Sequence, residues 1–215
     1  MVFSSLTFLY LFLPLCFICY YIVQKTSSRN VILLVFSLVF YAWGEPKYIF
    51  LMIATAFVDY VFGLLIERFR GRWQSKLFLT FAAVITLSSL ALFKYSSFFS
   101  ENVNSLFSLN LPSLKLALPI GISFYTFQTL SYTIDVYRKE MKPTKSFIDF
   151  AAFVTFFPQL VAGPIERASH LLPQFYKNRT FEYQNAVDGV KLIIWGMFKK
   201  VVVADNCAFF VNKIF

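Results

Sequence analysis

A series of long apolar runs, separated by short loops that carry most of the Lys and Arg residues, constrains this chain more than any other feature. Of the 215 residues, 58% are hydrophobic and only 14% are charged, whereas a soluble domain of this size carries about 25% charged residues. An apolar run of about 20 residues is long enough to cross a bilayer as a helix. An outer-membrane barrel would instead show short segments of alternating hydrophobicity. The sequence therefore predicts an all-α fold, a polytopic transmembrane helical bundle.

The candidate spans follow one another along the whole chain. We expect them at about residues 7–23, 30–43, 48–66, 77–93, 116–134, 147–161 and from 190 onward. The polar connection from Lys94 to Ser113 is expected to lie outside the membrane, and a second polar stretch reaches Gly189. No Pro-, Gly- or Ser-rich linker divides the chain, so residues 1–215 are expected to form a single transmembrane domain.

The net charge of +9 is concentrated in the loops between spans. Three of these loops are basic: the one with Lys25 and Arg29, residues 67–76 and residues 138–145. Basic loops stay in the cytoplasm, and all three can do so if the N-terminus lies outside. Membrane topology thus explains the charge without a nucleic-acid partner.

The stretch from Phe156 to Arg167 interrupts the apolar pattern most clearly. Pro158 and Pro164 each remove a backbone donor and break a regular helix. Within a membrane, irregular backbone is tolerated only where it is buried in protein or lines a cavity. Gly163 allows close backbone approach, and Gln159 offers both a donor and an acceptor. We expect this segment to form part of an internal site.

Several polar side chains fall inside the predicted spans. Asp59 must face protein or water, since an acid at that depth costs roughly 2.5–3.5 kcal/mol, and a structural role is favoured over a functional one. Gln128 and Ser131 share a helix face and are either interhelical hydrogen-bond partners or part of a polar cavity wall. Asp135 and Arg138 close that segment, as a boundary anchor or as substrate contacts.

Residues that could carry cofactor or base chemistry are few. Cys16 and Cys19 have Cys-x-x-Cys spacing without the further ligands that zinc needs, so they are interpreted as packing residues. His170, the one histidine of the sequence, could act as a base, but no Ser–His–Asp pattern accompanies it. A solvated or capping histidine is the favoured interpretation.

A series of motifs nevertheless resembles one family along the whole chain. It starts with Met-Val-Phe-Ser-Ser at the N-terminus, and its other members are Phe40-Tyr-Ala-Trp-Gly-Glu-Pro46, Leu118-Pro-Ile-Gly-Ile-Ser-Phe-Tyr-Thr-Phe-Gln128, Ser131-Tyr-Thr-Ile-Asp-Val-Tyr-Arg138, Phe156-Phe-Pro-Gln-Leu-Val-Ala-Gly-Pro-Ile165 and Gly196-Met-Phe-Lys-Lys-Val-Val-Val-Ala-Asp205. In this order they resemble the membrane-bound O-acyltransferases, in the branch of the bacterial alginate O-acetyltransferases.

The resemblance implies a ring of helices with broken segments, in the bacterial inner membrane, of which this chain would supply the N-terminal half. It also implies an acyl donor, acetyl-CoA or an acyl carrier, and transfer to hydroxyls of an extracytoplasmic cell-envelope polysaccharide. Membrane lipid and partner proteins of an acetylation complex would be its neighbours. The family's catalytic histidine lies beyond the Gly196–Asp205 motif, so the resemblance places no catalytic residue in this chain, and His170 does not match that position.

The residues expected to line the path of donor or acceptor have positioning or helix-breaking roles: Gln128, Asp135, Arg138, Gln159, Gly163, Pro164 and Arg167. Whether the chain itself is an enzyme stays open, because it lacks the family's histidine. The alternative is a non-catalytic membrane protein, as an inactive acyltransferase remnant, a partner subunit or a transporter-like protein. Broken helices with polar residues at depth also suit a transporter, although no internal repeat is visible.

Overall fold

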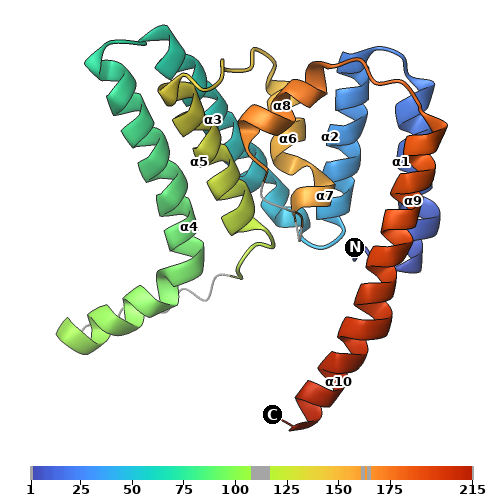
Figure 1. The fold of residues 1–215 in the computed structure, drawn as a ribbon. Coiled ribbons are helices and arrows are strands. Elements are labelled where there is room, and N and C mark those ends of the chain that lie inside the picture. The colour runs from blue at the N-terminus through green and yellow to red at the C-terminus, as the bar shows by residue number, and fades with distance from the viewer. Residues whose placement is uncertain (1, 108–116, 161–162, 164–165, 215) are drawn as a thin grey trace.

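The chain folds into helices joined by short loops (Figure 1). The computed structural model describes residues 2–107, 117–160, 163 and 166–214, and within them there is no strand. The all-α expectation is therefore confirmed. The elements are η1 (Phe8–Phe12), α1 (Leu13–Ile22), α2 (Thr26–Ala42), η2 (Pro46–Tyr48), α3 (Ile49–Arg68), α4 (Trp73–Phe107), α5 (Ile122–Arg138), α6 (Phe147–Thr155), α7 (Phe157–Leu160), α8 (Ala168–Tyr176), α9 (Tyr183–Met197), η3 (Phe198–Ala204) and α10 (Asp205–Ile214).

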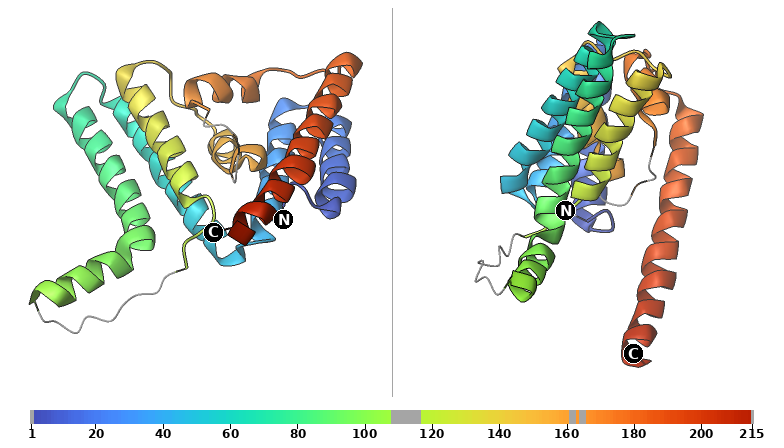
Figure 2. Two further views of the ribbon diagram at one scale, coloured as in Figure 1. Left: turned by 60° about the horizontal axis from the view of Figure 1, so that its bottom comes forward. Right: turned by 90° about the vertical axis from the view of Figure 1, so that its left-hand side faces the viewer.

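The helices form two packed groups that share the short central helix α6. In the first, α3 packs against α4 and α5, and α4 also packs against α5. In the second, α2 packs against α6, α7 and α8, and α1 leans on α2. Helix α6 contacts both α2 and α3, so it lies between the groups (Figures 1 and 2). All seven residues from Asp149 to Thr155 are buried, which makes α6 the centre of the core.

Two helices of the described chain are long and apolar enough to cross a membrane. They cover Pro46–Arg68 and Trp73–Ser96. The apolar helices Phe8–Ile22 and Thr26–Ala42 are shorter. Many large apolar side chains on the outer faces are exposed, including Tyr10, Phe50 and Leu192. Exposed apolar surface on this scale is typical of a membrane or interaction face, in agreement with a membrane protein.

The prediction of a polar loop from Lys94 to Ser113 is wrong for most of these residues. Helix α4 continues to Phe107, and residues 108–113 lie outside the described part of the chain. Ser and Asn rank low as helix formers, which suggested a loop. One of these side chains instead bonds within the helix: the Asn102 Nδ2 atom donates to the Phe98 carbonyl oxygen, 2.7 Å away.

Helix α5 begins at an unusual backbone position, after the helix-breaking residues Pro119 and Gly121. Gly121 precedes the helix with a φ of 77°, a left-handed conformation that glycine adopts without steric cost. A Cβ atom there would lie 2.6 Å from the Leu160 carbonyl oxygen. The start of α5 and the end of α7 can therefore approach only because residue 121 has no side chain.

Asp59 joins the three helices of the first group. It is fully buried in α3 and accepts hydrogen bonds from the Thr86 hydroxyl of α4 at 3.2 and 3.1 Å. The Thr129 hydroxyl of α5 lies beside the carboxylate, and it donates to the Thr126 carbonyl oxygen of its own helix, 3.2 Å away. The ion pairs of the described residues do not include Asp59, so its hydrogen-bond partners are hydroxyls. This geometry agrees with the structural role that the sequence favoured.

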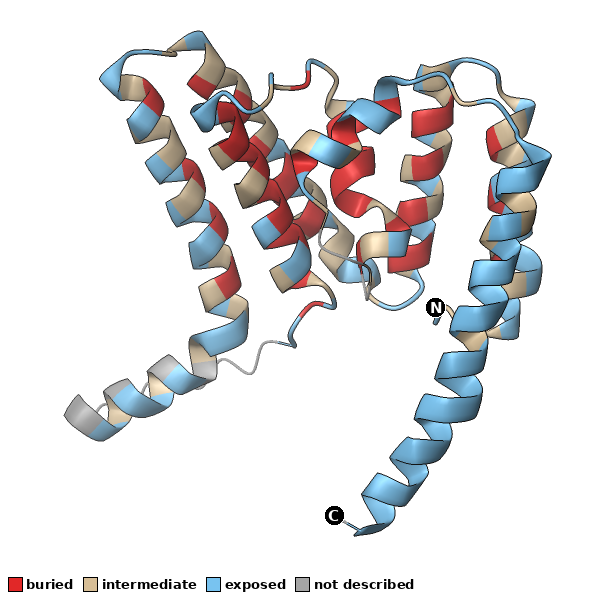
Figure 3. Cartoon of the chain, viewed as in Figure 1, coloured by how far each residue is buried: buried red, intermediate tan, exposed pale blue. Residues whose placement is uncertain are grey.

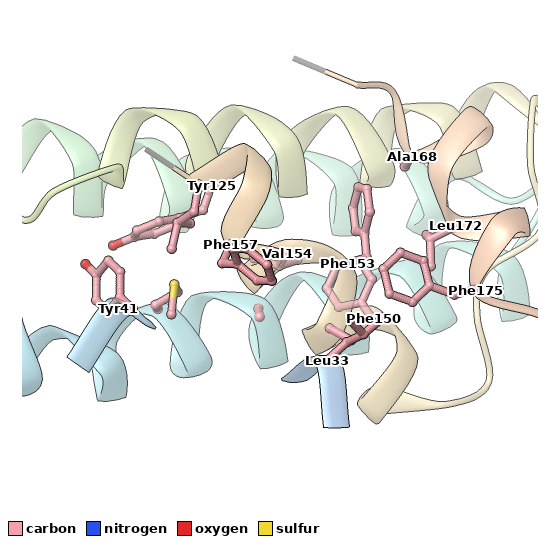
Figure 4. Close-up of a cluster of buried hydrophobic side chains, with 14 of the residues drawn as sticks. Leu33, Tyr41, Tyr125, Phe150, Phe153, Val154, Phe157, Ala168, Leu172 and Phe175 are labelled. Carbon is pink, nitrogen blue, oxygen red and sulfur yellow. The ribbon is translucent and has the colours of Figure 1, made fainter. Parts of the chain in front are cut away.

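An aromatic cluster holds the N-terminal elements against the broken segment. The rings of Phe8, Phe12 and Phe40 lie 5.4–6.1 Å from the ring of Phe157. Offset and edge-to-face aromatic pairs at such distances are worth about 0.5–1.5 kcal/mol beyond their buried area. Figure 4 shows how Phe157 continues into the apolar side chains of α6 and α8.

The three basic loops lie at one end of the bundle (Figure 1). These are the loops between α1 and α2, between α3 and α4, and between α5 and α6. The turn before η2 and the start of α5 lie at the opposite end, near the N-terminus (Figures 1 and 2). This arrangement is the one that a common cytoplasmic side for the basic loops requires.

Candidate functional site

The broken segment departs from helix at the position that the sequence indicates. Helix α6 ends at Thr155, and Phe156 takes a non-helical backbone with φ of −51° and ψ of 106°. A continuous helix would set Pro158 against the carbonyl group of Val154. The chain instead restarts with a single turn, α7, in which Pro158 occupies the first turn and no donor is lost. The Phe157 N–H donates to the buried Ser37 hydroxyl of α2, 3.2 Å away.

Two of the predicted site residues meet across this break. The Gln128 Nε2 atom of α5 donates to the Gln159 Oε1 atom of α7, 3.3 Å away, and to the Phe153 carbonyl oxygen, 3.1 Å away. Phe153 is in the last turn of α6, where its carbonyl oxygen also accepts a long hydrogen bond from the Phe156 N–H of the helix cap, at 3.5 Å. Gln128 is buried, whereas Gln159 is half-buried. The amide of Gln128 thus ties α5 to both sides of the break.

A second group of predicted residues gathers at the other end of α5. Asp135 is buried, and its Oδ2 atom has no hydrogen-bond partner. The charges of Glu140, Arg167 and Arg138 all act on its carboxyl group. Arg138 also lies 3.9 Å from Glu140, as an exposed ion pair. A buried carboxylate oxygen without a donor is costly, so Asp135 is an uncompensated polar group at this end of α5.

The two groups lie on one face of α5. Gln128 and Asp135 are seven residues apart, which is about two helical turns and about 10 Å of rise. Between Gln159 and Arg167 the chain passes from the first group to the second. Gly163 packs tightly there, because a Cβ atom would lie 2.4 Å from both the Gln159 Cα atom and the Pro158 carbonyl oxygen. Pro164 lies outside the described residues.

His170 is not part of either group. It is exposed in the first turn of α8, and its carbonyl oxygen accepts a hydrogen bond from the Gln174 side chain at 3.3 Å. The hydrogen bonds of the described residues do not include its imidazole ring. A base needs a partner within hydrogen-bond reach to be oriented, so this geometry favours the solvated histidine.

One buried polar contact near the site was not predicted. The Asn30 Nδ2 atom of α2 donates to Asp149 Oδ1 of α6 at 2.8 Å and to the Phe175 carbonyl oxygen at 2.9 Å. It connects the three helices α2, α6 and α8 below the basic loops. The sequence could have indicated that Asn30 needs a hydrogen-bond partner, because a polar side chain at the start of an apolar helix is usually paired. The identity of that partner, 119 residues away, could not be predicted in this way.

An apolar hollow of about 1100 Å³ borders the broken segment on the side away from α5. We refer to it as the α1–α9 hollow. The N-terminal residues, α1, α2, the broken segment and α9 with the start of η3 all contribute to it. Its lining includes Cys16, Tyr20, Leu33, Phe157, Pro158, Gly163, Arg179, Leu192, Ile193, Gly196, Met197 and Lys200.

Within the described ranges, no group of three or more His, Cys, Asp or Glu side chains is arranged to hold a metal ion. Cys16, Cys19 and Cys207 are free thiols, and Cys16 packs in the wall of the hollow. The two groups of predicted site residues beside α5 contain a pair of carboxamides, a carboxylate and two guanidinium groups. Side chains of these kinds can position polar ligands.

Comparison with known proteins gives relatives over the whole chain. It is 41% identical to a probable alginate O-acetylase, AlgI, of Azotobacter vinelandii over 213 residues, and 38% identical to one of Pseudomonas syringae over 220 residues. It is 33% identical to a peptidoglycan O-acetyltransferase of Helicobacter pylori over 242 residues. No family model matches the chain. No solved structure matches it either.

These matches cover nearly all of this chain but less than half of each relative. They include 97–100% of this chain, but only 42–46% of those three relatives. The chain therefore spans less than half the length of the curated relatives it matches. The motifs that carried the resemblance fall within the matched region, since the match extends over nearly every residue of the chain.

Proposed function

Because the chain belongs to the membrane-bound O-acyltransferase family, in the branch of the alginate O-acetylases, we propose that it is part of an enzyme that transfers acetyl groups to hydroxyls of an extracytoplasmic envelope polysaccharide. The observation that carries this proposal is identity of 33–41% along the whole chain to proteins named for O-acetylation of two different polymers. Alginate and peptidoglycan both carry sugar hydroxyls. The shared chemistry is thus ester formation on a carbohydrate.

The contribution of this chain is a wall that positions donor and acceptor. Gln128 and Gln159 can hold a carbonyl or hydroxyl oxygen at the break between α6 and α7, because carboxamides both donate and accept. Asp135, Arg138 and Arg167 form the charged end of the same wall. Gly163 packs tightly between them, and Pro164, which lies outside the described residues, stays a predicted helix breaker. Positioning of this kind can supply a large part of a rate enhancement without proton transfer.

The proton-transfer step needs a base that this wall does not provide. The resemblance puts the family's histidine beyond the Gly196–Asp205 motif, and the relatives are more than twice as long as their matched region. We therefore assign the base to the remainder of the whole protein. The acyl donor, acetyl-CoA or an acyl carrier, is proposed from the family as well, as are the partner proteins of an acetylation complex.

The proposed setting is the bacterial inner membrane, with several spans and the N-terminus outside. Residues 1–215 would form one transmembrane domain there. The basic loops at one end of the bundle support this orientation (Figure 1). Gln128 and Gln159 lie nearer the opposite end, where the acceptor polysaccharide would be found.

A deletion strain tests the proposal. Ester-bound acetate, released by mild alkali from the envelope polysaccharide fraction, is measured in the wild type, in the deletion strain and after complementation with the whole gene. We expect deletion to lower the acetate and complementation to restore it. Unchanged acetate in the deletion strain would favour the non-catalytic alternative.

A further inference from the structure

Two arginines lie together at the end of the α1–α9 hollow that is nearest the basic loops. The Arg179 NH1 atom donates to the Tyr20 hydroxyl, 3.0 Å away, and the guanidinium lies 5.4 Å from the centre of the Phe175 ring. The Arg29 guanidinium lies 5.2 Å from the centre of the Tyr20 ring and 5.7 Å from that of Tyr21. Arg29 also donates to the Arg179 carbonyl oxygen.

Neither guanidinium is neutralised by an acid. In the described part of the chain, the ion pairs are Glu67–Arg70, Arg138–Glu140, Asp188–Lys191 and Lys200–Asp205. Arg29 is 8% exposed, so its charge is largely buried, while Arg179 is half-buried and lines the hollow. The Arg29 Nε atom donates to the Val23 carbonyl oxygen, 2.6 Å away, and the Arg179 Nε atom donates to the Gln174 carbonyl oxygen, 3.2 Å away. These acceptors are neutral, so the positive charges stay uncompensated and favour an anion, and guanidinium groups suit the geometry of phosphate.

The rest of the hollow is apolar. One face of the C-terminal helix, with Leu192, Ile193, Gly196 and Met197, forms one side, and Leu13, Phe17 and Leu33 of α1 and α2 lie across from it. A volume of about 1100 Å³ is at the upper end of pockets that enclose small ligands, about 300–1,000 Å³. The acetyl group of the proposed reaction is too small to need so large an apolar space. An alkyl chain fits this lining.

We propose that the α1–α9 hollow binds an anionic phospholipid, with its phosphate at Arg179 and one acyl chain between α1 and α9. Arg29 adds positive charge behind the phosphate site. Arg179 lies beside Arg29, at the end of the bundle that carries the basic loops, and anionic lipids are enriched in the leaflet that such loops face. The binding site is distinct from the carboxamide pair of Gln128 and Gln159, which lies across the broken segment, although Gly163 borders both.

Native mass spectrometry of the whole protein in a mild detergent tests this inference. Phosphatidylglycerol and phosphatidylcholine with the same acyl chains are added in turn, and the apparent Kd of each lipid is measured. We expect phosphatidylglycerol to bind about tenfold more tightly, because its net negative charge is attracted by the uncompensated arginines, whereas the choline group of phosphatidylcholine offsets the charge of its phosphate. Equal binding of the two lipids would overturn the proposed headgroup site.

Two pairs of variants separate the headgroup from the chain. Arg179→Gln should lower phosphatidylglycerol affinity by about tenfold, whereas Lys177→Gln, an exposed change outside the hollow, should leave it unchanged. Gly196→Leu should weaken both lipids by filling the hollow. Gly189→Leu is its matched control, since both glycines are in α9 and an added Cβ meets no atom within 4 Å at either position.

The glycine pair keeps the test decisive even if Arg179→Gln disturbs folding. If Gly196→Leu and Gly189→Leu bind phosphatidylglycerol equally well, the hollow does not hold the acyl chain, and the proposal is wrong. That result would be expected if another segment of the whole protein or a second copy covers this face. If Gly196→Leu abolishes acetyl transfer but leaves lipid binding unchanged, the lipid proposal is also wrong, because this variant is expected to act on the lipid site.

Discussion

Gly121 shows most directly how a single residue of this chain is constrained. It combines a φ of 77° with a close approach to the Leu160 carbonyl oxygen. Gly121→Ala should lower the free energy of unfolding by more than about 2 kcal/mol, because the left-handed backbone alone costs about 1–2 kcal/mol for an L-residue and the Cβ atom meets backbone. Thermal unfolding in detergent measures this.

Gly189→Ala is the control for this substitution. Gly189 lies in α9, and an added Cβ has open space there. Ala should be neutral or stabilise the helix by about 0.5–1 kcal/mol. Equal unfolding temperatures for the two variants would show that α5 does not begin at Gly121 with the observed backbone.

Gln128 should matter for transfer through its two hydrogen bonds. Gln128→Leu removes the donor to both the Gln159 side chain and the Phe153 carbonyl oxygen. We expect the alkali-released acetate of a complemented deletion strain to fall about tenfold or more, since small misplacements of positioning groups cost up to about 100-fold in rate. Protein abundance in the membrane is measured alongside.

A surface glutamine provides the comparison. Gln184 is exposed on α9, where its Nε2 atom lies 3.2 Å from Asp188, and Gln184→Leu should leave acetate unchanged. Acetate at the wild-type level with Gln128→Leu, at normal protein abundance, would remove the wall from the proposed mechanism.

The sequence located this site only in part, and the residues show why. Pro158 fixes where α6 must end, because a missing donor and a steric clash are local effects. Gly121 likewise revealed the irregular start of α5. The meeting of Gln128 with Gln159, and of Asp135 with Arg167, depends on how α5 packs beside α6 to α8. No local pattern carries that information, and Asn30–Asp149 was missed for the same reason.

At the level of helices, the hydroxyl contacts of Asp59 are expected to hold α3, α4 and α5 together. Thr86→Val removes the donor that lies 3.1–3.2 Å from both carboxylate oxygens. Leaving buried acceptors unsatisfied costs about 1–3 kcal/mol each. We therefore expect a loss of this size in the free energy of unfolding, measured by denaturant titration in mixed micelles.

Thr80→Val is the matched change on the same helix. Thr80 is exposed and its hydroxyl bonds only to its own helix, at the Lys76 carbonyl oxygen. Its replacement should change stability by less than about 0.5 kcal/mol. If both variants are equally stable, Asp59 does not depend on Thr86, and the account of this joint fails.

The predicted helix boundaries agree with the observed ones where the apolar run is long and continuous. The prediction for residues 48–66 matches α3 closely. Helix α8 was missed, because it is short, polar and contains Pro173, and α4 was cut too early at Lys94. In both cases local propensity was a poor guide, since packing and side-chain contacts decide whether weak helix formers become helical.

For the whole molecule, the arrangement of loops predicts which positions face the cytoplasm. In a variant whose three cysteines are replaced by serine, Lys47→Cys should react with a membrane-impermeant maleimide in spheroplasts. Ser27→Cys and Arg72→Cys should react only after the membrane is opened. All three positions are exposed in the structure, so reactivity reports the side of the membrane. Labelling of all three positions in sealed cells would contradict the proposed orientation.

The C-terminal helix shows how the whole molecule extends beyond its packed core. From α9 to α10 no described residue is buried, and the exposed side chains include Trp195, Phe198 and Phe209 (Figure 3). Exposed apolar surface of this extent is normally covered by protein or lipid. The sequence predicted an apolar run here, but its separation from the other helices, and the hollow that results, could only come from the structure.

The most direct test of the account is the acetate of a deletion strain that receives either the whole gene or residues 1–215 alone. The whole gene, with or without His170→Ala, should restore ester-bound acetate, because His170 is exposed and its imidazole ring takes part in none of the described hydrogen bonds. Residues 1–215 alone should reach the membrane and restore none, since the wall positions groups but holds no base. Restoration by residues 1–215, lost again on His170→Ala, would contradict this division of roles.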